Sequence, residues 1–140
     1  MVLIFSFDQA IKNLGLCVLN IQKGGFDILR LDTWNMLEDG YNYKNQPKHI
    51  TAINLKHKLR ELDNWQQENY PDEQIIIMTE YIFRPGTIAE VIGHMIVYHY
   101  SGEDDIKVYG KVPPAQKNQI CLGGESLKYY NFAERYKKAY

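Results

Sequence analysis

Two acidic residues are the clearest candidates for chemistry, because each of them ends an apolar stretch. Asp8 follows the run VLIFSF, and Glu80 follows the run QIIIMT. A carboxylate at the end of a buried strand is costly to remove from water unless a cation or hydrogen bonds compensate its charge. Two such carboxylates repel each other unless a divalent cation neutralises them, and Mg²⁺ prefers oxygen ligands of this kind. We therefore predict that Asp8 and Glu80 are metal ligands; the other interpretation of Asp8 is an aspartate that caps its own turn.

The elements that must position these acids are predicted strands. Residues 2–8 and 14–19 are apolar runs separated by a short polar turn, which is typical of two buried strands joined as a hairpin. Residues 26–34 follow a Gly-Gly turn and alternate well enough to form a third strand, antiparallel to the second. The unbroken apolar run within residues 74–80 is typical of a strand covered on both faces, as in an α/β sheet. The two acids are therefore expected at the ends of two buried strands.

Two helices are predicted around the fourth strand. Residues 47–68 begin with a proline, which suits the first turn of a helix, and their apolar residues have mostly helical spacing. Residues 87–100 begin with a capping box, Thr87 and Glu90, and carry an apolar face that suits a sheet or a second subunit. Glu90 therefore has a local structural role and is not assigned to the site. The polar segment 35–46 is predicted to be a mobile loop.

The C-terminal third of the chain is basic. Residues 106–112 predict a short strand, and residues 125–140 predict a final helix rich in tyrosine and basic residues. From Lys107 to Tyr140 there are seven basic and two acidic side chains, whereas the preceding residues carry a net charge of −6. Such an asymmetry indicates an anionic partner, and a solvated helix face is the other interpretation.

Size and composition indicate one globular domain. The chain has 140 residues, of which 45% are hydrophobic and 24% charged, so it can bury a single core. Its two cysteines, Cys17 and Cys121, have no C-x-x-C spacing, which favours a reducing, cytoplasmic location. The N-terminal apolar run is short and interrupted by Asp8, so we expect neither a signal peptide nor a membrane span.

The predicted order of elements is that of ribonuclease-H-like proteins, and within it the sequence resembles the RuvC-type Holliday junction resolvases, including phage and viral members. Four places carry the resemblance: Asp8 with the turn and return strand KNLG at 12–15, the strand and aromatic at 75–83 with Glu80 and Phe83, Lys117, and Lys128. In order along the chain they correspond to the family's two acidic motifs and its pair of basic phosphate-binding positions. The resemblance covers nearly the whole chain.

The resemblance implies a fold and an activity. The fold is a mixed five-stranded sheet, with its first three strands antiparallel, flanked by helices in a single nuclease domain over residues 1–140. The activity is Mg²⁺-dependent endonucleolytic cleavage of four-way (Holliday) or other branched DNA, as in recombination and repair. Two symmetric nicks imply a homodimer, formed through the helix at 87–100. We expect two Mg²⁺ ions per site, with Mn²⁺ as a substitute, and no small-molecule cofactor. The expected location is the cytoplasm, which is that of a bacterial host if the protein is phage-encoded.

The resemblance also assigns roles to individual residues. Asp8 and Glu80 are the expected metal ligands and catalytic residues, together with Lys117 as a catalytic cation. The expected DNA contacts are Phe83, Arg84, Lys111, Lys117 and Lys128. Phe83 would stack on an unpaired base, a contact worth about 1–3 kcal/mol, and a core phenylalanine below the Glu80 strand is its other interpretation.

Two departures from the family pattern concern the site. Many members have a glycine two residues after the first aspartate, where this chain has Ala10. The family's last two acids form a pair on a helix after the basic segment, whereas the acids after Asp105 in this sequence are Glu125 and Glu134, which lack that spacing. We therefore expect the missing pair beyond Tyr140, with the end of the final helix absent from this chain.

Three alternative functions follow from these observations. An incomplete set of acids also fits a module that binds branched DNA without cutting it. An RNA-directed nuclease of the same superfamily would use the same acids. Sugar-kinase-like and Hsp70-like ATPases share an aspartate on the first strand but require a glycine-rich phosphate loop, and the turn at 9–13 contains no glycine.

Overall fold

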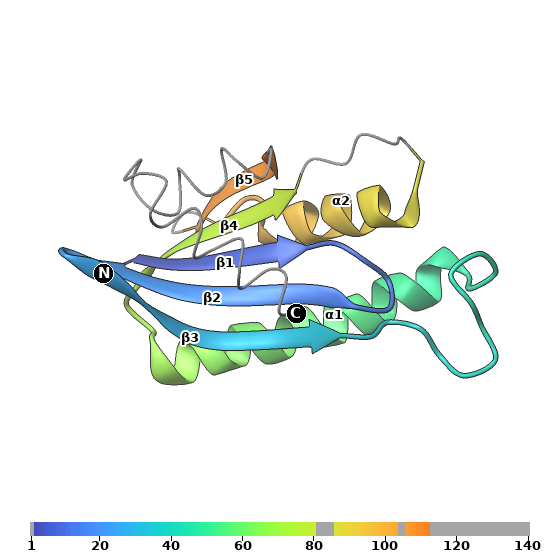
Figure 1. Cartoon of the computed structure of the whole chain (residues 1–140), viewed down its shortest axis with the longest axis horizontal. Helices are drawn as coiled ribbons and strands as arrows, with labels where there is room; N and C mark the ends of the chain where they lie inside the picture. The colour runs from blue at the N-terminus through green and yellow to red at the C-terminus, as the bar shows by residue number, and fades with distance from the viewer. Residues whose placement is uncertain (1, 81–85, 104–105, 113–140) are drawn as a thin grey trace.

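The computed structural model describes residues 2–80, 86–103 and 106–112 (Figure 1). These residues form, in chain order, β1 (Val2–Asp8), β2 (Leu14–Gln22), β3 (Gly25–Trp34), α1 (Lys48–Asn69), β4 (Gln74–Glu80), α2 (Ile88–Tyr100) and β5 (Ile106–Val112). The predicted final helix at 125–140 lies outside the described residues. Among the described helices, none is both long and apolar enough to cross a membrane.

One mixed sheet, with the strand order β3-β2-β1-β4-β5, forms the centre of the fold. β1 pairs antiparallel with β2 and parallel with β4, while β3 is antiparallel to β2 and β5 is parallel to β4. The predicted α/β fold, with its first three strands antiparallel, is therefore confirmed. The parallel pairing of β1 and β4 brings their C-terminal ends to the same edge of the sheet.

The main core lies between one face of the sheet and both helices, as the ribbon in Figure 1 shows. Alternate residues of β1 point into it, and Leu3, Phe5 and Phe7 have no exposed surface. The helices contribute buried aliphatic side chains at helical spacing: Leu55, Leu59 and Leu62 from α1, and Ile92 and Ile96 from α2. Burying each of these large side chains stabilises the fold by about 1.5–3 kcal/mol.

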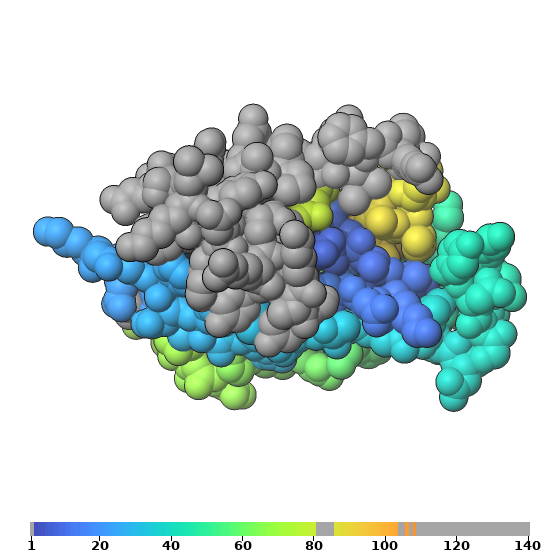
Figure 2. Space-filling view, viewed as in Figure 1, coloured from blue at the N-terminus to red at the C-terminus, as the bar shows by residue number. Residues whose placement is uncertain are grey.

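A buried glutamine organises the segment between β3 and α1. The Gln46 side chain accepts a hydrogen bond from the Glu38 N–H at 2.8 Å and donates to the Met36 carbonyl at 2.9 Å and the Thr51 hydroxyl at 2.7 Å. The Met36 N–H donates to the Ile11 carbonyl at 2.8 Å, which connects this segment to the β1–β2 turn. In Figure 2 the turn, in blue, lies beside the teal loop and the yellow start of α2. The segment predicted to be a mobile loop is therefore tied to its surroundings by specific hydrogen bonds.

A polar cluster joins α1 to α2. The Tyr100 hydroxyl donates to Asp63 Oδ1 at 2.8 Å, and His99 Nε2 lies 2.7 Å from Asp63 Oδ2. Tyr100 is 3% exposed, and its ring meets that of Phe5 edge to face. Burial, followed by the charge and the hydrogen bond of Asp63, raises the pKa of the Tyr100 hydroxyl well above its ordinary value. The hydroxyl therefore stays protonated in the folded protein at neutral and moderately alkaline pH.

We predict that Tyr100→Phe lowers the free energy of unfolding by about 1–2 kcal/mol near neutral pH, because it removes one hydrogen bond to a charged group and keeps the ring. The pKa in the folded state is raised, so this contribution is complete below the unfolded-state pKa of 10.0 and declines above it. Above that value, ionisation of Tyr100 in the unfolded state should lower the free energy of unfolding of the wild type by about 1.4 kcal/mol per pH unit. The difference in stability between the wild type and Tyr100→Phe should therefore disappear at about pH 11.

Urea denaturation at several pH values measures this effect. Tyr98→Phe is the matched control, because Tyr98 lies on the same helix and is 84% exposed. A difference between wild type and Tyr100→Phe that stayed constant up to pH 11 would contradict the assignment.

Candidate active site at the ends of β1 and β4

The two predicted acids end neighbouring parallel strands. β1 and β4 pair in register from Val2 with Gln74 to Ser6 with Met78. Two residues beyond the last pair, each strand reaches its final residue, Asp8 in β1 and Glu80 in β4. Because adjacent strands lie about 4.8 Å apart, the structure brings these two acids to the same level on neighbouring strands.

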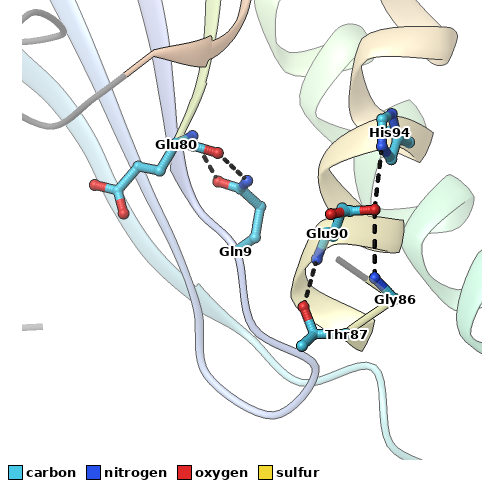
Figure 3. Close-up of polar contacts among 6 residues, drawn as sticks. All are labelled: Gln9, Glu80, Gly86, Thr87, Glu90 and His94. Atoms are coloured by element: carbon cyan, nitrogen blue, oxygen red, sulfur yellow. Dashed lines mark hydrogen bonds and ion pairs between the residues drawn. The ribbon is translucent and has the colours of Figure 1, made fainter. Parts of the chain in front are cut away.

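Both acids lie on the face of the sheet that α1 and α2 do not cover. Side chains alternate between the faces of a strand, and Phe7 and Ile77 point into the helix-covered core. Asp8 and Glu80 therefore lie on the opposite face, Asp8 exposed and Glu80 partly exposed. Figure 3 shows the Glu80 carboxylate pointing away from α2. The arrangement puts two carboxylates within reach of a ligand that approaches this face.

A glycine stands opposite Asp8 on the other side of β1. Gly15 of β2 is its cross-strand partner, and a Cβ atom placed on Gly15 would lie 3.5 Å from the Asp8 Cβ. This is ordinary contact, so alanine would fit, but a larger side chain would occupy the space beside the carboxylate. The glycine predicted in the return strand thus leaves the β2 side of Asp8 open.

The residue after Asp8 holds the end of β4 in place, a role that the sequence did not indicate. The Gln9 side chain donates through Nε2 to the Glu80 carbonyl at 2.9 Å and accepts through Oε1 from the Glu80 N–H at 2.9 Å (Figure 3). Gln9 is 6% exposed. A primary amide carries a donor and an acceptor side by side, as a peptide group does, so it can substitute for a strand residue. The position of Gln9 directly after a strand-end acid is the only signal that the sequence offers.

The start of α2 has the predicted cap. Thr87 Oγ1 accepts from the Glu90 N–H at 3.4 Å, and the Glu90 carboxylate accepts from the Gly86 N–H at 3.5 Å (Figure 3). His94 Nε2 lies 3.7 Å from the same carboxylate. Glu90 is therefore occupied at the helix terminus, as predicted, and the acids considered for the site remain Asp8 and Glu80.

The donor set suits a hard divalent cation. Mg²⁺ is commonly held by one or two carboxylates, with water and substrate phosphates completing its coordination. Within residues 2–80, 86–103 and 106–112, no group of three or more histidine, cysteine, aspartate or glutamate side chains could hold a metal ion. Asp8 and Glu80 supply two carboxylates, the number and kind of protein ligand that commonly hold Mg²⁺.

The structure describes no side chain of the other predicted site residues. Phe83, Arg84, Lys117 and Lys128 lie outside the described residues, and of Lys111 only the backbone, in β5, is described. Their roles remain predictions.

Comparison with known proteins gives a likeness in structure and none in sequence. No protein-family model matches the chain, and no curated protein sequence matches it significantly. The fowlpox virus Holliday junction resolvase superimposes with a TM-score of 0.54 at 11% identity, over 86% of this chain and 72% of that one. T. thermophilus RuvC, solved in complex with a Holliday junction substrate, superimposes with a TM-score of 0.54 at 17% identity, over 85% of this chain and 69% of that one.

At these identities the likeness concerns the fold. The resemblance to RuvC-type resolvases, inferred from short motifs, is thereby confirmed at the level of architecture: the chain has a fold similar to that of the fowlpox virus Holliday junction resolvase and of T. thermophilus RuvC.

Proposed function

We propose that this protein is a structure-selective endonuclease of the RuvC type, which cuts four-way DNA junctions with the help of divalent metal ions. The observation that carries the proposal is the placement of Asp8 and Glu80 at the same level, on the same face, at the ends of two parallel strands. The supporting observation is the fold, which is that of two proteins described as acting on Holliday junctions or as resolving them.

The proposed chemistry is hydrolysis of a phosphodiester bond. Mg²⁺, when held by these acids, would supply an activated water and stabilise the charge on the leaving oxygen. Asp8, which is exposed, and Glu80, which is partly exposed, would hold the ions at the C-terminal ends of β1 and β4. Lys117 neutralises charge that develops on the phosphate, and Lys128 and Lys111 contact the DNA backbone.

The remaining predicted residues have proposed roles in recognising the junction. Phe83 stacks on an unpaired base at the junction centre, and Arg84 beside it binds a phosphate. Both directly follow β4, so they lie within a few residues of Glu80 along the chain. We also propose that the protein works as a homodimer through α2, because resolution requires two symmetric nicks. The exposed Tyr98 on this helix is available for such an interface.

A second candidate function is a module that binds branched DNA without cutting it. One observation favours it: the described residues supply two acids to the site, and no larger group of metal-ligating side chains. Such a module would use the same basic and aromatic residues, and Asp8 and Glu80 would then have no metal-dependent role.

A cleavage assay separates the two functions. The substrates are a synthetic four-way junction, a linear DNA duplex of the same sequence and an RNA–DNA hybrid, each with Mg²⁺ and with EDTA. We expect paired nicks in the junction that require Mg²⁺ and are absent from the duplex. Tight junction binding without nicks would favour the binding module, and preferential cutting of the hybrid would indicate an RNA-directed nuclease.

We predict that Asp8→Asn and Glu80→Gln each lower the cleavage rate by more than about a hundredfold, because loss of residues that merely orient metal ligands already costs 10- to 100-fold. Junction affinity should stay equal or rise, since one negative charge near the phosphates is removed. Asp72→Asn is the matched control, because Asp72 is exposed at the opposite end of β4. Gel-shift and single-turnover assays measure both quantities. Parallel loss of binding and cutting in Asp8→Asn would mean that Asp8 has a structural role.

A further inference from the structure

We propose that Gln9 is a positioning residue of this site, and that Gly93 of α2 provides the space which Gln9 needs. The inference rests on the proposed function for its catalytic consequence, while its structural part stands on the contacts of Gln9 alone. Gln9 would act on Glu80 through the backbone, without touching metal or DNA.

Gln9 completes the hydrogen bonding at the end of β4. β1 ends at Asp8, so a regular ladder toward Glu80 would need one more strand residue. The Gln9 side-chain amide replaces that residue by bonding to both the N–H and the carbonyl of Glu80, each at 2.9 Å. Both backbone groups are partly buried, so losing the amide would leave a donor and an acceptor without this partner.

On its other side, β4 pairs with β5. The pairing of β4 with β5 is regular up to Met78 and Tyr109, and then shifts, so that Glu80 pairs with Val112. Such irregularities redirect the side chains next to them. The ladder with β5 is irregular directly before Glu80, whereas the two hydrogen bonds between Gln9 and the Glu80 backbone connect this residue to the end of β1.

The Gln9 side chain packs closely against Gly93 of α2. Gly93 is buried and faces Gln9, and a Cβ atom placed on Gly93 would lie 2.8 Å from Gln9 Nε2. The same Cβ would lie 3.6 Å from Cδ and 3.7 Å from Cγ, which is ordinary contact. Only the tip of the side chain is therefore crowded. That tip donates to the Glu80 carbonyl, so moving it away from a larger residue 93 would disturb this hydrogen bond.

The consequence is a link between the helix and the site. Figure 3 shows Gln9 between Glu80 and α2, with the Glu80 carboxylate on the side away from Gln9. Gln9 thus fixes the level of Glu80 beside Asp8 while leaving the carboxylate accessible. Replacing Gln9 should loosen the carboxylate pair without removing either acid.

Three variants test the proposal: Gln9→Leu, Gly93→Ala and the double variant. Gln66→Leu is the matched control, because Gln66 is also a buried glutamine, 4% exposed, and donates to the Tyr70 carbonyl at the C-terminal end of α1. Gly93→Ala is informative even if Gln9→Leu folds poorly, since alanine favours the helix more than glycine does.

Two readouts are needed. Hydrogen exchange of the Glu80 amide, measured by NMR without metal or DNA, reports the backbone contact directly. The Mg²⁺ concentration that gives half-maximal junction cutting reports the carboxylate pair. We expect faster exchange at Glu80 and an approximately tenfold higher Mg²⁺ requirement in Gln9→Leu and Gly93→Ala, and neither change in Gln66→Leu. Adding Gly93→Ala to Gln9→Leu should have little further effect, because leucine has no atom at the crowded Nε2 position.

The outcomes separate this inference from the proposed function. Unchanged Glu80 exchange in both single variants would overturn the positioning role, as would fully additive effects in the double variant. A wild-type protein that does not cut junctions would overturn the proposed function, and the exchange of the Glu80 amide would still decide whether Gln9 positions Glu80.

Discussion

The parallel pairing of β1 with β4 is the constraint on which the proposed site depends. Strands that run in the same direction end at the same edge, so residues far apart in the chain reach one level of the sheet. In this protein the two residues delivered there are Asp8 and Glu80. Both helices cover the opposite face, where the large core lies. The hydrophobic core thus sets the strand register, and the register places two carboxylates together at an accessible edge.

Placing two like charges side by side costs free energy, and the surrounding contacts hold the backbone of both acids in place despite that cost. Gln9 extends the pairing of β1 and β4 beyond the end of β1 through two hydrogen bonds to Glu80. Buried Ile11 and the hydrogen bond from Met36 to its carbonyl hold the turn that follows Asp8. A rigid pair of carboxylates is a better cation site than a flexible one, because less conformational freedom is lost when the ion binds.

The strands, the helices and the two strand-end acids could be predicted from the sequence, because strong local patterns indicate each of them. Apolar runs marked β1 and β4, and the acids at their ends followed directly; the proline and the capping box marked α1 and α2. The contacts that hold the site together are different in kind. Gln9 contacts Glu80 and Gly93, which are far from it in the sequence. Tyr100 likewise contacts Asp63, and both sets of contacts depend on how the sheet and the helices pack. Gln46 likewise orders a loop whose polar composition suggested mobility. No local pattern encodes such pairs, since each depends on the tertiary arrangement.

Direct titration with Mn²⁺, followed by electron paramagnetic resonance of the free ion, tests most simply whether Asp8 and Glu80 form one cation site. The wild-type protein should bind Mn²⁺ saturably, and Mg²⁺ should compete for the same site. Asp8→Asn and Glu80→Gln should each weaken binding by at least about tenfold, because each removes one of two carboxylate ligands. Undiminished Mn²⁺ binding in both variants, or no saturable binding by the wild type, would contradict a shared metal site at the ends of β1 and β4.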